Sequence, residues 1–353
     1  MIVHDTCQAR DDQLKLDHSC WQQIEKNIVK DACFFCGRLN VDRDGHPPDL
    51  TATGTLLKVA LRRIQNGQQR IKSKKGIFMK ETILLVGHGS RDEEGNVEVD
   101  EFAQYWQSKH PDWRIEVCWI EHAEILPDAG LDKAAEGSDR VILLPLILNA
   151  AGHVKMELPE YLEQARLRHP QVQFLMGRHL GVDERILKLV RMRIHSAMVT
   201  LDMPDPKTTS IILLGRGSSD MSANGEVAKM ARWVFETTRH DQVDYAFTGI
   251  TYPRVETVVA RQVACGAMQI IIAPYYLFTG RLIKRIENQV QRMTRQYPQI
   301  AFSLAGYLGI NDRVVEVLES RLAEVREHSV SMMECDGCRI REIAHEHGID
   351  HHH

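Results

Sequence analysis

The sequence predicts an α/β fold in which two duplicated domains, each with a doubly wound parallel sheet, face a central cleft. One reason is a repeat, since an aliphatic run ending in a glycine-flanked turn occurs as ILLVGHGS at 83–90 and as IILLGRGS at 211–218. Another is that PLILNAAGHV from Pro145 matches PYYLFTGRLI from Pro274, apart from one gap. The third is that strand-like and helix-like segments alternate in both copies, which favours right-handed βαβ crossovers.

The first copy contains four short aliphatic runs that predict strands, because runs of Ile, Leu and Val are typical of strands buried on both faces. Between them lie longer stretches whose apolar residues recur with helical spacing. The predicted strands are residues 82–86, 115–120, 140–148 and 172–176, and the predicted helices are residues 96–109, 128–136, 158–168 and 182–199.

The second copy repeats this order of segments. Its predicted strands are residues 210–214, 243–248, 269–276 and 300–304, and its predicted helices are residues 224–238, 254–264, 281–296 and 311–327. Between the copies, LDMPDPKT at 201–208 carries two prolines and predicts a hinge. We therefore expect one domain at residues 79–200 and a degenerate second copy at residues 209–328.

The first 78 residues fit neither copy. They show no strand–helix alternation, and Met79 stands where the first copy would begin on its own. Residues 1–78 are therefore either a small accessory module or an upstream extension of the reading frame. They contain one C-x-x-C pair, Cys33 and Cys36.

The end of the chain, residues 329–353, is rich in cysteine and histidine. It contains a second C-x-x-C pair, Cys335 and Cys338, followed by five histidines. In a reducing compartment, cysteines with this spacing favour a metal over a disulfide. We expect this tail to bind a metal.

Composition limits the class of protein. The chain has 353 residues, a formal net charge of −4 and 43% hydrophobic residues, as expected for a globular protein of two domains. It shows no apolar run of the ~20 residues that a membrane span needs and no secretory signal. We expect a cytoplasmic protein with no membrane or nucleic-acid partner, because nucleic-acid binding needs a concentrated basic face.

Two histidines follow predicted strands of the first copy. His88 and His153 lie in the turns after the first and third predicted strands, and ligands of open α/β sheets bind at the carboxyl ends of strands. Two imidazoles at one edge predict a transition-metal site with open positions, although solvated loop histidines are the alternative for each taken alone. Glu157, four residues after His153, is a candidate base or orienting partner, or simply an exposed residue at a helix start.

The second copy lacks three polar groups of the first. Arginines stand at the second-copy positions of both histidines, Arg216 and Arg281, and glycine stands at that of Glu121. This joint loss suggests one working site, to which Glu121 belongs. The arginines, with Lys155 nearby, are candidates for holding a polycarboxylate, because a guanidinium pairs with carboxylates through two hydrogen bonds. Structural salt bridges between the domains are the alternative.

These motifs resemble a known family. GHGSRD after the first strand, PLILNAAGHVKMELP, GRGSSDMSANGEVAK and APYYLFTGRLIKRI are similar, in this order, to the long-type sirohydrochlorin cobaltochelatases, which are class II chelatases. The resemblance covers about residues 80–328 and extends to the Cys/His-rich tail. It implies a chelatase-like, flavodoxin-like fold and the ATP-independent insertion of Co²⁺ into sirohydrochlorin on the anaerobic route to cobalamin.

The resemblance also implies roles for site residues. The two motif histidines of the family correspond to His88 and His153, which would ligate the incoming metal and assist proton removal. The strand-end glutamate corresponds to Glu121, an orienting residue or base, whereas the family more often has aspartate at the position of Glu157. Positive groups around the cleft, Arg91 among them, would meet the eight carboxylates of the macrocycle.

For the tail, the resemblance suggests an iron–sulfur centre such as a [4Fe–4S] cluster. Two thiolates are too few for it, so a second subunit of a homodimer or the other cysteine pair would complete it. A zinc or cobalt site that uses the terminal histidines is the rival. For the whole chain, a sirohydrochlorin ferrochelatase for sirohaem and a cobalt or nickel storage or delivery protein remain alternatives, because two imidazoles do not select cobalt over iron or nickel.

Overall fold

The computed structural model describes residues 79–328. The N-terminal extension at residues 1–78 and the Cys/His-rich tail at residues 329–353 lie outside the described residues, and so do both C-x-x-C pairs. Within the described part of the chain, no helix combines the length and the apolar character that a membrane span requires.

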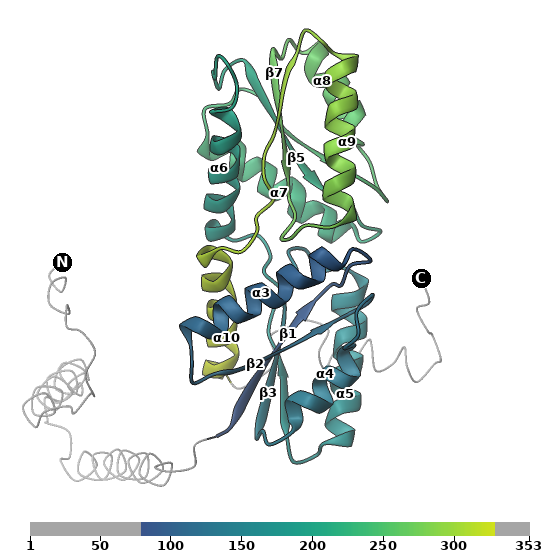
Figure 1. Ribbon diagram of the computed structural model, residues 1–353, viewed down its shortest axis with the longest axis vertical. Helices are drawn as coiled ribbons and strands as arrows, with labels where there is room; N and C mark the ends of the chain where they lie inside the picture. The colour runs from purple at the N-terminus through teal and green to yellow at the C-terminus, as the bar shows by residue number, and fades with distance from the viewer. Residues whose placement is uncertain (1–78, 329–353) are drawn as a thin grey trace, which may run out of the picture. The chain divides into compact units, whose positions relative to one another are not determined.

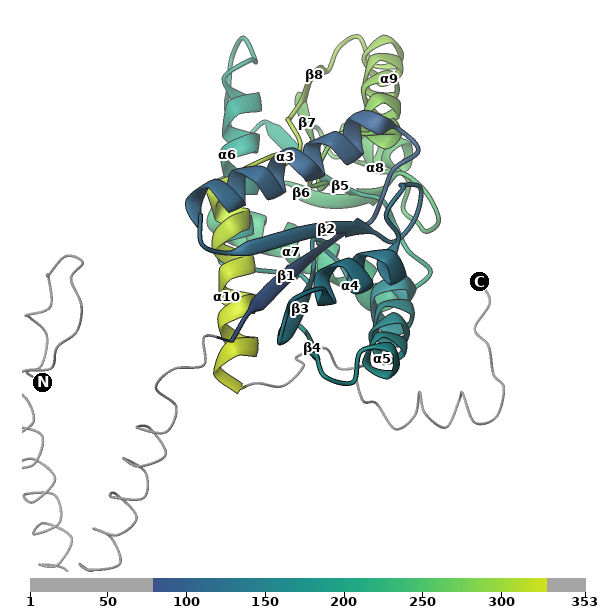
Figure 2. The ribbon, with the colours of Figure 1, turned by 60° about the horizontal axis from the view of Figure 1, so that its bottom comes forward.

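The first half is a four-stranded parallel sheet with the strand order β2-β1-β3-β4 (Figures 1 and 2). A π-helical turn, η1, precedes its third helix. The elements are β1 (Glu81–Gly87), α3 (Glu93–Lys109), β2 (Arg114–Trp119), α4 (Pro127–Ala135), β3 (Arg140–Pro145), η1 (His153–Glu157), α5 (Leu158–Arg168), β4 (Gln173–Met176) and α6 (Glu184–Met198).

The second half repeats this topology, with the strand order β6-β5-β7-β8 and all strands parallel. Its elements are β5 (Thr209–Gly215), α7 (Met221–Thr237), β6 (Val243–Phe247), α8 (Val255–Ala264), β7 (Gln269–Pro274), α9 (Arg281–Gln296), β8 (Ala301–Leu304) and α10 (Asp312–His328). Every predicted strand and helix is present within a few residues of its expected position. The predicted fold class, two α/β units with parallel sheets, is confirmed.

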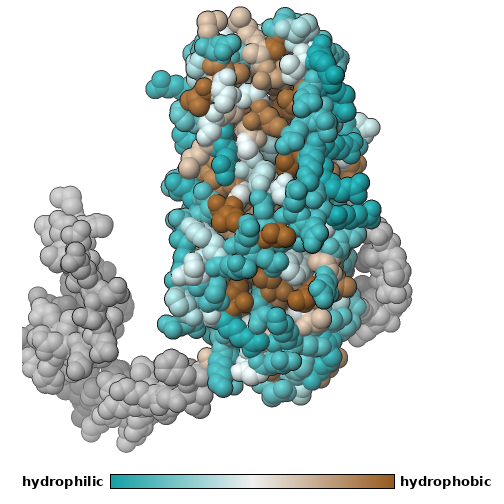
Figure 3. Space-filling model, viewed as in Figure 1, coloured by the Kyte–Doolittle hydropathy of each residue, from teal (hydrophilic) through white to brown (hydrophobic). Residues whose placement is uncertain are grey.

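The central strands are buried on both faces, as their aliphatic sequence predicts. Ile83 and Leu85 of β1 belong to the largest apolar cluster, whereas Leu84 and Val86 point to a second cluster on the other face of the sheet. Side chains alternate between faces along a strand, so a run without polar residues suits only a sheet covered by helices on both sides. The outer surface seen in Figure 3 is largely hydrophilic, with scattered apolar patches.

The last helix of each half packs on the sheet of the other half. Helix α6 follows β4 but packs against β7 and β8, and α10 follows β8 but packs against β3. The two helices also contact each other, and Figures 1 and 2 show each beside the opposite set of strands. Leu189 of α6 and Leu318 of α10 are fully buried in one apolar cluster with residues of both sheets. The two halves therefore share a continuous core.

Reciprocal ion pairs join the turns at the carboxyl ends of the strands. Lys155 Nζ of η1 lies 2.6 Å from Asp220 Oδ2 at the start of α7, and Lys284 Nζ of α9 lies 2.9 Å from Asp92 Oδ2 at the start of α3. Burial raises the pKa of Asp220, but the hydrogen bonds from Lys155 and the α7 backbone outweigh it and lower the pKa. The carboxyl edges of the two sheets thus face each other.

Candidate active site at the facing sheet edges

The turn after β1 holds two of the predicted site residues against each other. Gly89 has a φ of +88°, and a Cβ atom there would lie 1.6 Å from the carbonyl oxygen of Glu121. The Glu121 N–H in turn donates to the carbonyl of His88 at 3.1 Å. Only glycine permits this approach, which fixes the two residues side by side. The second half repeats the geometry with Gly217, whose φ is +87°.

An asparagine locks each of these turns. The Asn96 side chain accepts from the Ser90 N–H at 2.9 Å and donates to the Ser90 carbonyl at 3.0 Å. Asn224 does the same for Ser218, at 2.9 and 2.8 Å. Both backbone groups of each serine are satisfied, so these hydrogen bonds hold the turn that follows each central strand in place.

His88 lies between one residue of each half. Arg216 Nη1 is 2.7 Å from His88 Nε2, and His88 Nδ1 is 3.4 Å from Glu121 Oε1 and 3.3 Å from the Gly89 carbonyl oxygen. A guanidinium only donates, so Nε2 is the accepting nitrogen and the ring proton of the neutral imidazole sits on Nδ1, facing Glu121. The His88 side chain is 32% exposed. Nε2 is therefore the ring atom whose lone pair can bind a metal, while the Glu121 carboxylate orients the ring through Nδ1.

A third histidine at this edge, His122, is one that the sequence pattern does not single out. His122 Nε2 lies 3.2 Å from Glu121 Oε2 and 3.3 Å from Arg91 Nε, so the nitrogen can donate to the carboxylate or accept from the arginine, one at a time. His122 has a φ of +56°, and Ile250 at the same place in the second half has a φ of +61°. The signal available was the position directly after Glu121 at a strand end.

The remaining predicted site residues lie on η1 and α9. His153 is the first residue of η1 and Glu157 is the last, so the sequence HVKME forms a π-helical turn where an α-helical start was expected. π-Helical turns are frequent at functional sites. Lys155 is paired with Asp220, and Arg281 is the exposed first residue of α9. The structure thus gathers His88, Glu121, Arg216, Arg91 and His122 at one place.

None of the described side chains forms a group of three or more His, Cys, Asp and Glu residues arranged to hold a metal ion.

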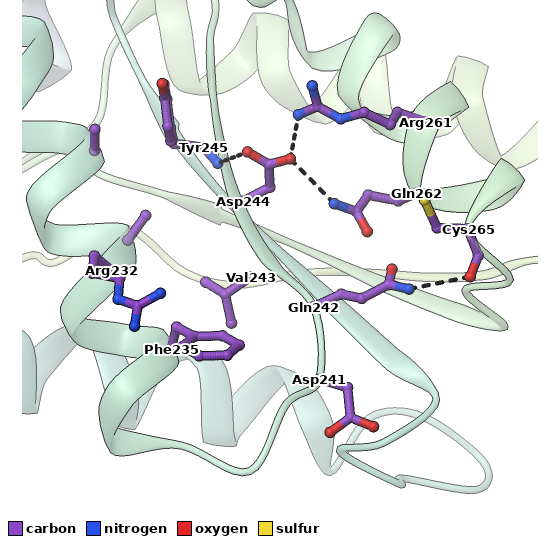
Figure 4. A pocket seen from close by; sticks show the side chains of 12 residues that line it. Arg232, Phe235, Asp241, Gln242, Val243, Asp244, Tyr245, Arg261, Gln262 and Cys265 are labelled. Carbon is purple, nitrogen blue, oxygen red and sulfur yellow. Dashed lines mark hydrogen bonds and ion pairs between the residues drawn. The ribbon is translucent and has the colours of Figure 1, made fainter.

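A hollow of about 390 Å³ in the second half lies elsewhere. It opens at the amino end of β6, where Asp244 accepts from Arg261 and Gln262, and Gln242 donates to the Cys265 carbonyl (Figure 4). These polar groups satisfy one another, and the hollow is at the opposite end of the strands from the one at which α/β sheets bind ligands. The facing edges around His88 are the better candidate.

The chain is similar to known proteins over both halves. The model of the CbiX family matches the chain twice, at residues 82–197 and 210–325. The sirohydrochlorin cobaltochelatase of Priestia megaterium is 38% identical over 282 residues, which are 78% of this chain and 89% of that protein. The sirohydrochlorin ferrochelatase of Bacillus subtilis is 28% identical over 268 residues, 76% of this chain and 100% of that protein.

A solved structure, SirB from Bacillus subtilis with Fe³⁺, has a similar overall fold. It superposes with a TM-score of 0.62 at 28% sequence identity, covering 71% of this chain and 97% of that one. The two family matches begin 128 residues apart, the same spacing that separates His88 from Arg216.

Proposed function

We propose, from the premise that the chain belongs to the CbiX family of class II chelatases, that it is a lyase that inserts Co²⁺ into sirohydrochlorin without ATP. The observation that carries the proposal is the contact of His88 with Glu121 of its own half and with Arg216 of the other half. One set of contacts supplies a metal-binding nitrogen, an orienting carboxylate and a carboxylate-binding cation. The higher identity to the cobaltochelatase of Priestia megaterium favours cobalt for this step.

In the proposed reaction, the four pyrrole nitrogens of the macrocycle replace water on the metal, and two pyrrole N–H protons leave. His88 binds the incoming Co²⁺ through Nε2, and His153 is its proposed second ligand. Neutral imidazoles leave coordination positions open for the macrocycle. Glu121 holds the His88 ring through Nδ1–H, and its carboxylate offsets the charge of the cation and is a candidate acceptor for a leaving proton.

Arg216 links the two substrates. In the structure its guanidinium donates a hydrogen bond to His88 Nε2, the nitrogen that would bind the metal. A carboxylate of the macrocycle binds a guanidinium more strongly than a neutral imidazole does, because both groups are charged and two hydrogen bonds form. We therefore propose that the arriving macrocycle draws Arg216 away from His88 and so opens Nε2 to the metal.

Removing this competition should strengthen metal binding by the protein without macrocycle. Arg216→Ala deletes a hydrogen bond to His88 Nε2 and a positive charge beside it, so we expect the affinity for Co²⁺ to rise by roughly tenfold. The rise is measured by calorimetric titration or by the absorption of bound Co²⁺.

Two further variants separate the causes. Arg239→Ala removes the same charge from an exposed position at the other end of the strands and should leave the affinity unchanged. Arg216→Lys keeps the charge but loses the planar donor, so its affinity should lie between those of the wild type and Arg216→Ala. An Arg216→Ala protein that binds Co²⁺ no more tightly than the wild type would show that Arg216 does not compete with the metal.

The function itself is tested by an anaerobic insertion assay with sirohydrochlorin and Co²⁺, Fe²⁺ or Ni²⁺, followed by the absorption spectrum of the macrocycle. We expect insertion without ATP, fastest with Co²⁺, both for the full chain and for a chain beginning at Met79. Faster insertion of Fe²⁺ would assign the protein to sirohaem formation. Tight Co²⁺ binding with an unchanged macrocycle spectrum would indicate metal storage or delivery.

Other assignments of the sequence stay predictions. Arg91, Lys155 and Arg281 are proposed to meet macrocycle carboxylates, and Glu157 to act as a base or orienting residue near His153. The metal site of the tail, whether a [4Fe–4S] cluster or zinc, and a homodimer that completes it rest on residues outside the described range. The domain boundaries at 79–200 and 209–328 likewise remain expectations.

A further inference from the structure

A row of basic side chains covers the outward face of α9. The buried face of this helix is apolar and includes Ile283, Ile286 and Val290. The outward face is exposed to solvent and carries Asn288 and a set of basic side chains. Figure 3 shows hydrophilic surface along the flank where Figure 1 places α9. The basic row consists of Arg281, Lys284, Arg285, Arg292 and Arg295.

The duplication does not account for the basic row. The elements η1 and α5 occupy the same place in the first half. At the five positions there that lie 128 residues before the members of the basic row, the sequence has no lysine or arginine. A helix after the third strand therefore packs on its sheet without such a row. The corresponding residues are His153, Met156, Glu157, Gln164 and Leu167.

Most of the basic row lacks a neutralising partner. Lys284 Nζ lies 2.9 Å from both Asp92 and Glu94, and these hydrogen bonds raise its pKa. Among the residues that the structure describes, the four arginines form no ion pair with a carboxylate, and α9 itself carries one acid, Glu287. Like charges three or four residues apart destabilise a helix. An anion from outside the chain would remove this repulsion.

The basic row begins at the candidate active site and leads away from it. Arg281 follows the turn after β7, at the same sheet edge that carries Arg216. With a rise of 1.5 Å per residue, Arg292 and Arg295 stand about 16 and 21 Å farther along the helix axis. The near end of the row thus stands at the sheet edge that carries the candidate site, and the far end stands well away from it.

We infer that the basic row of α9 is an electrostatic guide that captures the polycarboxylate macrocycle and directs it to the facing sheet edges. The inference rests on the proposed function, because it takes the eight carboxylates of sirohydrochlorin as the anion. Complementary charge raises the rate of encounter and is screened by salt. The far arginines therefore act on association and not on the chemical step.

The test compares two charge-reversed full-length proteins. Arg292→Glu/Arg295→Glu reverses the far end of the row, and Lys188→Glu/Arg191→Glu makes the same charge change at the same spacing on exposed positions of α6. For the first protein, we expect kcat/KM for sirohydrochlorin to fall about tenfold at low ionic strength, with kcat within twofold and the difference lost at high salt. The control should stay within twofold throughout.

A second readout is the association rate of sirohydrochlorin without metal, followed by stopped-flow absorbance. It should fall in the α9 protein alone. Equal losses in both proteins, an unchanged α9 protein, or a fall in kcat at constant KM would each overturn the inference. A wild type that binds the macrocycle but inserts no metal overturns the proposed function while the association rates still decide on the guide.

Discussion

Replacing His88 with alanine should lower the rate of Co²⁺ insertion into sirohydrochlorin by at least about a hundredfold, because the Nε2 lone pair proposed to hold the metal is lost. The initial rate is measured anaerobically by the spectral change of the macrocycle. Glu121→Gln should cost less, about tenfold, since the amide still accepts from Nδ1–H but no longer offsets the charge of the bound cation. His153→Ala is the corresponding test of the second proposed ligand.

His195→Ala is the matched control, because it removes one imidazole from an exposed position on α6. It should insert cobalt at the wild-type rate. If His88→Ala and His153→Ala also kept the wild-type rate, the assignment of these two residues would be wrong, whatever the activity of the chain.

Gly89→Ala should have the second large effect, on the fold and on metal binding together. The added Cβ would lie 1.6 Å from the Glu121 carbonyl oxygen, at a φ of +88° that alanine tolerates poorly. We expect the free energy of unfolding to fall by about 3 kcal/mol or more. Because the turn must move away from Glu121, the contact between that carboxylate and His88 is broken, and Co²⁺ binding should be lost.

The second half supplies the comparison. Gly217→Ala places a Cβ 2.3 Å from the carbonyl oxygen of Gly249, at a φ of +87°. This variant should also unfold at a lower temperature, although less so, because a glycine at the opposing position can shift more easily. It should keep Co²⁺ binding, since no proposed metal ligand lies in that turn. Thermal denaturation and metal titration of both proteins decide the matter, and loss of Co²⁺ binding in both would contradict a site confined to the first half.

The sequence was sufficient for the elements and the fold class, because each element has its own local signal. The aliphatic runs ILLVG and IILLG are typical of buried parallel strands. Gly89 and Gly217, two residues after these runs, mark turns that only glycine can make. The repeat then placed Arg216 where His88 stands in the other copy. The structure adds that these two matching residues touch across the facing edges.

Other features had no local signal. The amphipathic pattern of α6 shows that one face is buried but not which sheet buries it, so the exchange of α6 and α10 could not be predicted. The contact of His122 with Glu121 depends on a backbone φ of +56° at His122. A histidine in the sequence does not indicate a positive φ. The arginines of α9 were visible as charges, but their common outward face became apparent only once the buried face was known.

The exchanged helices restrict how the protein can move. A clamshell motion that parted the two sheets would pull α6 from β7 and β8 and α10 from β3, exposing the core that both halves share. We therefore expect no domain closure of the kind that is common where two α/β lobes meet at a hinge. We expect the macrocycle to enter and leave without the two sheets parting, and turnover to rely on local side-chain motion such as the proposed release of His88 by Arg216.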